Sequence, residues 1–315
     1  MASNVTRPMG PSTRTAELLT LLQWSGVGPV TARKLLVQRK DSESLLETAR
    51  RYRDQPSERA ERISQGKAAR ILEACASHNL CVIGIEDEEF PSLLRSIPDP
   101  PPIIYVRGDV QALSLKAVAV VGTRKVSEEG KRIARMISRF LARKDVSVVS
   151  GLALGTDTMA HIGALEGEGV TVAVMAHGLD IVAPSSNRDL AEEIVRKRGA
   201  LMSEHPPGVP PRPAEFVRRN RLQSGLSHAS IVVESGVTGG AVHQATFARE
   251  QGRTLMTVLA SDARAGRGLN EAGARHLIEE LNAIPIRGTR ELWEMLERLR
   301  PPGKEPTVYQ PEFDW

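Results

Sequence analysis

Three glycine turns follow short apolar runs of this 315-residue chain, and their chemistry suits an anion such as phosphate. Glycine allows a sharp turn, and the free N–H groups of a helix that starts there carry partial positive charge. A single turn of this kind is usually only a tight connection, whereas three on one edge of a sheet favour a phosphate site. The candidate residues are Gly122, Thr123, Arg124, Lys125, Gly151, Gly155, Thr156, Gly239 and Gly240.

A cationic block, FVRRNR at residues 216–221, supplies a second candidate site. Three arginines stand within four residues, an aromatic side chain precedes them, and a proline-rich loop at 206–213 comes before the block. Guanidinium groups pair with phosphates and an aromatic ring can stack on a base, which suits a single nucleic-acid strand. The candidate residues are Phe216, Arg218, Arg219, Asn220 and Arg221. In the alternative interpretation, these arginines open a helix and pair with Glu192, Glu193 or Glu215.

A third pattern, LLQWSGVGPVTARKLL at residues 21–36, is typical of a helix-hairpin-helix. Gly26 and Gly28 would form the hairpin, and the amides that open the second helix could donate to a phosphate oxygen without reading a base. Arg33 and Lys34 stand close by in the sequence. A plain connection between two packed helices explains the pattern equally well.

Acidic residues also stand at the expected ends of strands and helices. Asp157 follows the second glycine turn, where a carboxylate would repel phosphate, so we expect it to organise its own loop. His161, one helical turn later, is expected to be packed or hydrogen-bonded rather than catalytic. Glu204 and Glu234 end two apolar runs, and a pair of carboxylates at that edge could cleave an N-glycosidic bond.

Short apolar runs alternate with amphipathic helices along the chain, and these elements must position the candidate residues. Strands are expected at 81–85, 103–106, 118–121, 146–149, 171–175, 200–203, 231–233, 254–258 and 283–286. Strand-to-helix units in series predict an α/β fold with a doubly wound, mostly parallel sheet that binds ligands at the carboxyl ends of its strands. No GxGxxG follows the first parallel strand and no GxxxxGK[ST] occurs, so no nucleotide cofactor is expected.

Composition limits the classes of partner. Lys and Arg number 42 against 38 Asp and Glu, so an anion-binding surface must come from local clustering rather than from net charge. Aromatic residues make up only 3% of the chain, which favours contacts to a nucleic-acid backbone over a platform of stacked rings. Cys75 and Cys81 are not spaced for a metal, and we expect reduced thiols in the cytoplasm. No run approaches a membrane span.

Several blocks of the sequence resemble the signature of the DprA/Smf family of DNA-processing proteins, over roughly residues 80–260: VVGTRKVSEEG, SGLALGTDTMAH and SEHPPGVPPRPAEFVRRNRLQSGLS. The resemblance implies an extended Rossmann domain that binds single-stranded DNA, with Arg124 in contact with the strand. It also implies help in loading a RecA-type recombinase during natural transformation, and no catalysed reaction. Because exposed sheets commonly associate, a homo-oligomer is expected as well.

Composition, hydrophobic pattern and the resemblance together divide the chain into four parts. We expect a flexible tail at 1–14, a small all-helical helix-hairpin-helix (SAM-like) domain at 15–77, an extended Rossmann domain at 78–288, and a terminal helix with a disordered tail at 289–315. The winged helix that often ends members of the family is not expected.

Two other functions stay open. The related LOG-type nucleotide phosphoribohydrolases carry GGxGTxxE in the loop that corresponds to Gly239 and Gly240, and Thr246 stands here where their catalytic Glu would be. That difference argues against hydrolysis. The other function is a module that senses a small phosphorylated nucleotide and signals through a partner.

Overall fold

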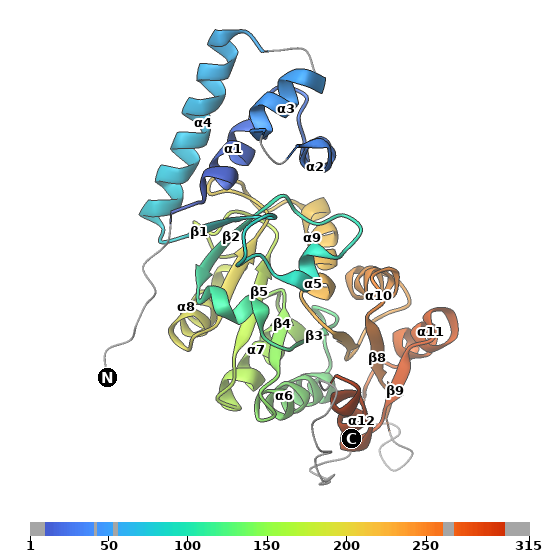
Figure 1. Cartoon of the computed structure of the whole chain (residues 1–315). Coiled ribbons are helices and arrows are strands. Elements are labelled where there is room, and N and C mark those ends of the chain that lie inside the picture. Colours follow the sequence, from blue (N-terminus) through green and yellow to red (C-terminus); the bar gives the residue numbers. More distant parts are fainter. Residues whose placement is uncertain (1–9, 41–42, 53–55, 261–267, 300–315) are drawn as a thin grey trace.

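The computed structural model describes residues 10–40, 43–52, 56–260 and 268–299. Its centre is a nine-stranded sheet with the order β1-β2-β6-β5-β4-β3-β7-β8-β9 (Figure 1). The strands are β1 (Cys81–Gly84), β2 (Ile103–Gly108), β3 (Ala117–Val121), β4 (Ser147–Ser150), β5 (Thr171–Met175), β6 (Ala200–Ser203), β7 (Ala229–Val232), β8 (Thr254–Val258) and β9 (Ile284–Ile286). Strands β3 to β9 are parallel, whereas β1 and β2 pair in antiparallel fashion. The expected α/β fold with a doubly wound, mostly parallel sheet is confirmed.

Helices connect these strands and precede them. The α-helices are α1 (Thr13–Leu21), α2 (Pro29–Gln38), α3 (Leu45–Tyr52), α4 (Glu58–Ser77), α5 (Ser92–Arg95), α6 (Glu128–Ala142), α7 (Thr156–Glu166), α8 (Arg188–Arg196), α9 (Pro213–Gly225), α10 (Gly240–Glu250), α11 (Ala272–Leu281) and α12 (Thr289–Arg298). Two 3₁₀ helices are η1 (Val110–Ser114) and η2 (Ser185–Asn187).

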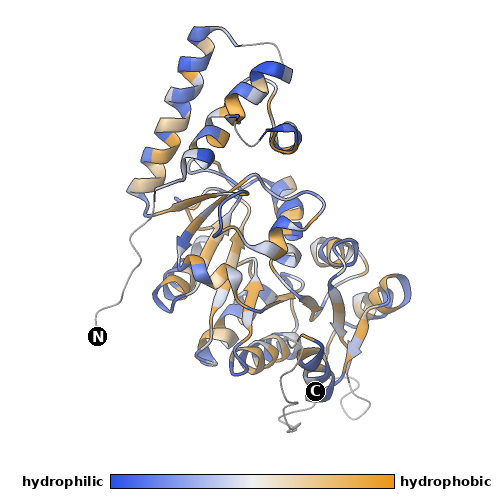
Figure 2. Ribbon diagram, viewed as in Figure 1, coloured by the Kyte–Doolittle hydropathy of each residue, from blue (hydrophilic) through white to orange (hydrophobic). Residues whose placement is uncertain are grey.

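Successive side chains of β3 point to opposite faces of the sheet, and helices pack against them on both faces. Val118 and Val120 belong to an apolar cluster with α6 and α12, whereas Ala117 and Ala119 belong to a second cluster with α5 and α9. Because both faces are covered, β3 is apolar throughout instead of alternating with polar residues. In Figure 2, several central strands are coloured mainly as hydrophobic, whereas the helices around them carry both hydrophobic and hydrophilic residues.

The strand order reverses at β3. The next three strands, β4 to β6, lie on one side of it, and β7 to β9 lie on the other. Val118 pairs with Val148 of β4 and also with Ala229 of β7, so β3 is hydrogen-bonded to both halves of the sheet. In doubly wound sheets, a ligand crevice forms outside the carboxyl ends of the strands at such a reversal.

Helices α1 to α4 lie at one end of the molecule, above β1 and β2 in the view of Figure 1. They share an apolar cluster with the sheet, since Leu18 of α1 packs in the same core as Val82 and Tyr105. Thr15 Oγ1 also donates a 2.6 Å hydrogen bond to Asp87, just beyond β1. Among the described residues, the buried apolar side chains of the helical segment belong to the same cluster as side chains of β1 and β2, on both sides of the proposed boundary near residue 78.

The chain ends differ in part from expectation. Thr13 and Arg14, expected within a tail, form the first turn of α1 because Ser12 Oγ accepts the N–H of Thr15 as an N-cap. The remaining tail residues, 1–9 and 300–315, lie outside the described part of the chain. No helix in the described part is long and apolar enough to cross a bilayer.

Candidate nucleic-acid interface

A cavity of about 490 Å³ opens at the carboxyl ends of β3 and β7, where the strand order reverses. Its walls come from the first and third glycine turns, from the start of α10 and from α9. The expected site residues that line it are Gly122, Thr123, Arg124, Phe216, Arg219, Asn220, Gly239 and Gly240, together with Asp157. The structure thus brings the first and third turns together with the arginine block.

The first turn carries exposed cations at the mouth of this cavity. Arg124 places its guanidinium 5.0 Å from the centre of the Phe216 ring, a cation–π contact that joins the turn to α9. Lys125 is exposed beside it, and its N–H donates to Thr123 Oγ1 at 3.2 Å. Thr123 N–H donates to the carbonyl of Glu234 at 2.8 Å, which ties the end of β3 to the end of β7.

The second turn is closed to an anion because the protein itself uses its polar groups. The carboxylate of Asp157 accepts the N–H groups of Gly151 (3.2 Å) and Ala153 (3.4 Å), as the expected loop-organising role requires. Thr156 N–H donates to the carbonyl of Thr123 instead of facing solvent. Gly155 has φ +85°, and a Cβ atom there would lie 2.5 Å from the carbonyl oxygen of Arg124. The second turn therefore holds the first turn in place.

The third turn leads into α10, which begins at Gly240 and whose first N–H groups are not capped by a side chain. Gly239 has φ +117° and nothing within 4 Å of an added Cβ atom, so the backbone there is accessible. Asn220 Nδ2 donates to the carbonyl of Gly240 at 3.0 Å and fixes the turn to α9. The α10 start, which carries partial positive charge, therefore lines the same cavity as Arg124.

Arg219 lies inside the protein, beneath the cavity. The side chain is 4% exposed and donates from Nη1 to the carbonyl of Val174 in β5. Burial lowers the pKa of Arg219 to about 10, and the charge of Asp157 opposes that change. Burial likewise raises the pKa of Asp157, and the charge of Arg219 acts against it. His161 is fully buried against Thr171 Oγ1 at 2.7 Å, and burial followed by the charge of Arg219 lowers its pKa to about 3.

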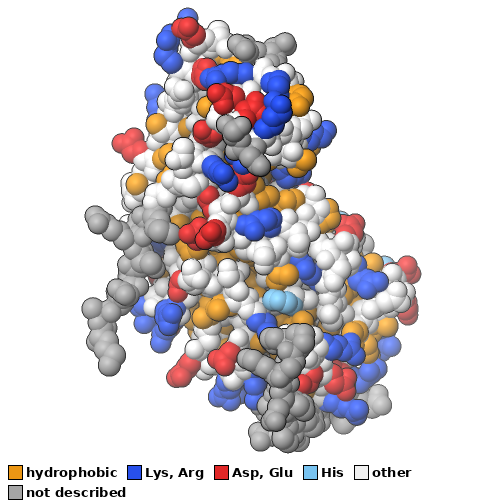
Figure 3. All heavy atoms as spheres, viewed as in Figure 1, with side chains coloured by type: hydrophobic (Ala, Val, Ile, Leu, Met, Phe, Trp, Pro, Cys, Tyr) orange, Lys and Arg blue, Asp and Glu red, His pale blue; other side chains and the backbone are white. Residues whose placement is uncertain are grey.

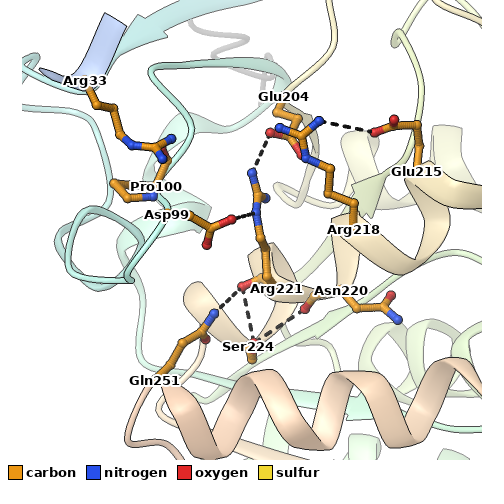
Figure 4. Close-up of polar contacts among 10 residues, drawn as sticks. All are labelled: Arg33, Asp99, Pro100, Glu204, Glu215, Arg218, Asn220, Arg221, Ser224 and Gln251. Atoms are coloured by element: carbon orange, nitrogen blue, oxygen red, sulfur yellow. Dashed lines mark hydrogen bonds and ion pairs between the residues drawn. The ribbon is translucent and has the colours of Figure 1, made fainter. Parts of the chain in front are cut away.

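Arg221 is also buried, in a group of three charged residues (Figure 4). Its Nε lies 2.6 Å from Asp99 and its Nη2 lies 2.7 Å from Glu204. The side chains of Arg221 and Glu204 are 3% and 7% exposed. The expected exposed patch of three arginines is therefore not found, because the loop after α5 covers the second half of α9: a Cβ atom on Gly225 would meet Ile97 at 3.1 Å.

Only Arg218 of the three arginines reaches solvent. Its side chain is 47% exposed, and Nη1 lies 4.0 Å from Glu215, which is one of the partners that the alternative interpretation named. Glu215 is also 3.1 Å from His205. On the face drawn in Figure 3, positive and negative side chains are interspersed. Arg124, Lys125 and Arg218 are the exposed cationic side chains among the candidate residues of the first turn and the arginine block.

The helix-hairpin-helix residues lie apart from this cavity. Gly26 turns the chain with φ +73°, and Gly28 is the N-cap of α2. Arg33 does not face a phosphate site, since its Nη1 donates to the carbonyl of Pro100 at 3.0 Å and joins α2 to the loop that holds Asp99 (Figure 4). Lys34 borders a separate cavity of about 1090 Å³ between the N-terminal helices.

Both carboxylates that could serve a hydrolase have structural partners. Glu204 pairs with Arg221, and Glu234 Oε2 accepts hydrogen bonds from the hydroxyl (2.7 Å) and N–H (3.1 Å) of Ser127. Thr246, at the position of the hydrolase glutamate, donates from its hydroxyl to the carbonyl of Val242 within α10. Among the described residues, no cluster of His, Cys, Asp and Glu could hold a metal ion.

Two buried polar residues that line the cavity were not identified from the sequence. Gln244 and Ser235 line it, and they are 1% and 3% exposed. Gln244 follows the third glycine turn by four residues, so helical spacing could have placed it on the cavity side of α10. Asp99, the partner of Arg221, had no such signal because it is 122 residues away in the sequence.

Comparisons with known proteins identify the family of the chain. The sequence model of the family described as DNA recombination-mediator protein A matches residues 81–297. The chain is 36% identical to DNA processing protein DprA of Bacillus subtilis over 193 residues, which cover 61% of this chain and 65% of that protein. It is 35% identical to Protein Smf of Escherichia coli over 239 residues, covering 75% of this chain and 62% of that protein. The chain thus spans less than two thirds of the length of these two relatives.

Two solved structures are similar as well. The X-ray structure of DNA processing protein A from Streptococcus pneumoniae has a TM-score of 0.73 and 29% identity, covering 86% of this chain and 94% of that one. DNA processing protein A of Helicobacter pylori, whose structure concerns its single-stranded DNA binding mode, has a TM-score of 0.61 and 26% identity, covering 70% and 97%. Since the family model matches more than half of the chain, this protein belongs to the DNA recombination-mediator protein A family, which is the family of the DprA and Smf proteins.

Proposed function

We propose that this protein binds single-stranded DNA across the cavity at the carboxyl ends of β3 and β7, and that it catalyses no reaction. One observation carries the proposal: Arg124, whose guanidinium lies over the Phe216 ring, lines the same cavity as the uncapped start of α10. A guanidinium on one side and helix amides on the other can hold a phosphate group between them. The similarity to the Helicobacter pylori protein, whose structure concerns single-stranded DNA, supports the same ligand.

The proposal divides the candidate residues into two groups. The residues that would touch DNA are Gly122, Thr123, Arg124, Lys125, Phe216, Arg218, Gly239 and Gly240. The residues that would position them are Gly151, Gly155, Thr156, Asp157, Arg219, Asn220 and Arg221, because their polar groups or their space are taken by the protein itself. Few of the first group could read a base edge, so binding should depend little on sequence.

The absence of catalysis is supported by the two candidate carboxylates. Glu204 is neutralised by Arg221, and Glu234 holds the N-cap of α6 through Ser127. These structural contacts of both carboxylates argue against a role as general acid or nucleophile. Titration with single-stranded DNA, duplex DNA and mononucleotides, with chromatography of the products, tests the proposal. Tight single-strand binding without turnover supports it, and release of free base from a mononucleotide would establish the hydrolase instead.

Further partners are proposed from the family alone. A RecA-type recombinase and a second copy of this chain are the partners that the resemblance suggests. A weaker DNA contact is proposed at the hairpin of Gly26 and Gly28, with Lys34, whereas Arg33 is already bound to Pro100. Sedimentation of the protein alone, and then with recombinase, tests the two protein partners. Substitution of Lys34 by Ala tests the hairpin contact, since DNA affinity should fall modestly.

A further inference from the structure

Exposed apolar side chains surround the proposed DNA site. Among the described residues, Leu154, Val217 and Val237 are 50%, 37% and 52% exposed. Val217 lines the cavity, and the other two adjoin residues that line it, namely Ala153 and Gly236. We call these three side chains the aliphatic rim. They come from three separate segments, the β4–α7 loop, α9 and the β7–α10 turn.

The fold holds the rim in place without using it as core. None of the three side chains belongs to an apolar cluster of the interior. The loop that bears Leu154 is fixed because Asp157 accepts the N–H of Ala153, and the helix that bears Val217 is fixed by the contact of Phe216 with Arg124. Three such side chains beside one cavity offer apolar surface that the interior of the protein does not use.

We propose that the aliphatic rim contacts the unstacked bases of single-stranded DNA and supplies the preference for a single strand over a duplex. This inference rests on the proposed function. The occupant follows from the charge around the rim: Arg124, Lys125 and Arg218 are exposed there, and the uncapped start of α10 faces the same cavity. Phosphates drawn to these groups bring the attached bases against the apolar side chains beside them.

The aliphatic rim can distinguish single-stranded from duplex DNA because the two expose different parts of their nucleotides. A single strand presents the apolar faces of its bases, whereas a duplex keeps those faces stacked inside and presents mainly phosphate and sugar. Burial of apolar surface is not directional, so contact with Leu, Val and any base adds affinity without selecting a sequence. An abasic strand keeps the phosphates and removes the bases, and it therefore isolates the contribution of all base contacts. Substitutions in the rim then separate its share from that of the Phe216 ring.

The test compares three ligands of equal phosphate number: oligodeoxythymidylate, an abasic oligomer and a duplex. The unaltered protein should bind the abasic oligomer and the duplex at least tenfold more weakly than oligodeoxythymidylate. The salt dependence per phosphate contact should be the same for the two single strands, at a slope of about −0.7, and steeper for the duplex, at about −0.9. Leu154→Ala, Val217→Ala and Val237→Ala should each weaken oligodeoxythymidylate binding roughly threefold, in proportion to the apolar area lost. None should change the affinity for the abasic oligomer.

Leu115→Ala is the matched control, because Leu115 is 41% exposed at the opposite, amino edge of the sheet. Its DNA affinity should equal that of the unaltered protein. Val237→Thr keeps the shape of the side chain and adds a hydroxyl, so it can replace Val237→Ala in the test if the alanine variant misfolds.

Equal binding of abasic and thymidylate strands overturns the inference and leaves the proposed function standing. Failure to bind any single strand overturns both. Rim variants that bind DNA normally but dissociate an oligomer in sedimentation overturn it in favour of an interface between copies.

Discussion

Arg221 holds its guanidinium 2.7 Å from the carboxylate of Glu204, and both side chains are almost fully buried. The same guanidinium also reaches Asp99 at 2.6 Å, so it joins the end of β6 to the loop after α5. The sequence places Arg221 next to the exposed Arg218 in one cationic block, yet the two arginines have different environments. They should therefore respond differently to the same substitution.

Arg221→Ala should destabilise the protein. Removing one partner of a buried ion pair leaves Glu204 charged and unpaired, which typically costs about 3–5 kcal/mol. The melting temperature should fall, while the slope of log affinity against log salt for single-stranded DNA should stay unchanged. Thermal unfolding and binding at several salt concentrations measure both quantities. A shallower slope at an unaltered melting temperature would return Arg221 to the DNA-contacting group.

Arg218→Ala should have the opposite effects: little loss of stability and a changed salt dependence of DNA binding. This side chain is 47% exposed and its 4.0 Å pair with Glu215 adds little, so stability should change by about 0.5 kcal/mol or less. If Arg218 neutralises one phosphate of a single strand, the salt slope should become shallower by roughly 0.7. The change should be equal on poly-dT and on a mixed sequence. A change confined to one sequence would instead show that Arg218 reads a base.

Gly155→Ala tests the contact between the first and second glycine turns. The backbone has φ +85°, and a Cβ atom would lie 2.5 Å from the carbonyl oxygen of Arg124, so strain and steric overlap should act together. We expect a loss of stability of about 3 kcal/mol or more, and weaker DNA binding because Arg124 must move. Gly239→Ala is the control: φ is +117° but the space is open, so strain alone should cost about 1–3 kcal/mol. Equal losses for both variants would contradict the packing argument.

His161 should make the protein less stable in mild acid. Burial, followed by the charge of Arg219, lowers the pKa of His161 from 6.5 to about 3 in the folded state. Below pH 6.5, the unfolded chain binds a proton that the folded chain does not accept until about pH 3. The free energy of unfolding should therefore fall as pH decreases through this window, by about 1.4 kcal/mol per pH unit from this group.

His161→Gln should make that decrease less steep, as measured by denaturant unfolding between pH 7 and pH 4. The remaining slope has other sources, since burial also lowers the pKa values of His177 and His228. The exposed His243 is the control residue, and His243→Gln should keep the slope of the unaltered protein. An unchanged slope in the His161 variant would show that another group carries the acid sensitivity.

Local patterns in the sequence were enough to predict the fold and the position of part of the candidate site. Apolar runs that end in glycine predicted β3 and its first turn, because a strand buried on both faces is continuously apolar. The place of Asp157 at a helix start predicted that it organises its loop, and its carboxylate accepts the N–H groups of Gly151 and Ala153. The burial of Arg219 and Arg221 could not be predicted in this way, because it depends on Val174 and Asp99, which approach α9 only in the folded chain.

The core that α1 to α4 share with β1 and β2 has a consequence for cooperativity. Leu18 and Tyr105 lie in one apolar cluster, so separation of the helical segment would expose apolar surface on both sides of the boundary. The two parts should then melt together, and calorimetry should show a single transition with equal van't Hoff and calorimetric enthalpies. Deleting the helices would remove part of the sheet's support as well as the hairpin. Point substitutions such as Lys34→Ala therefore separate binding from folding where truncation cannot.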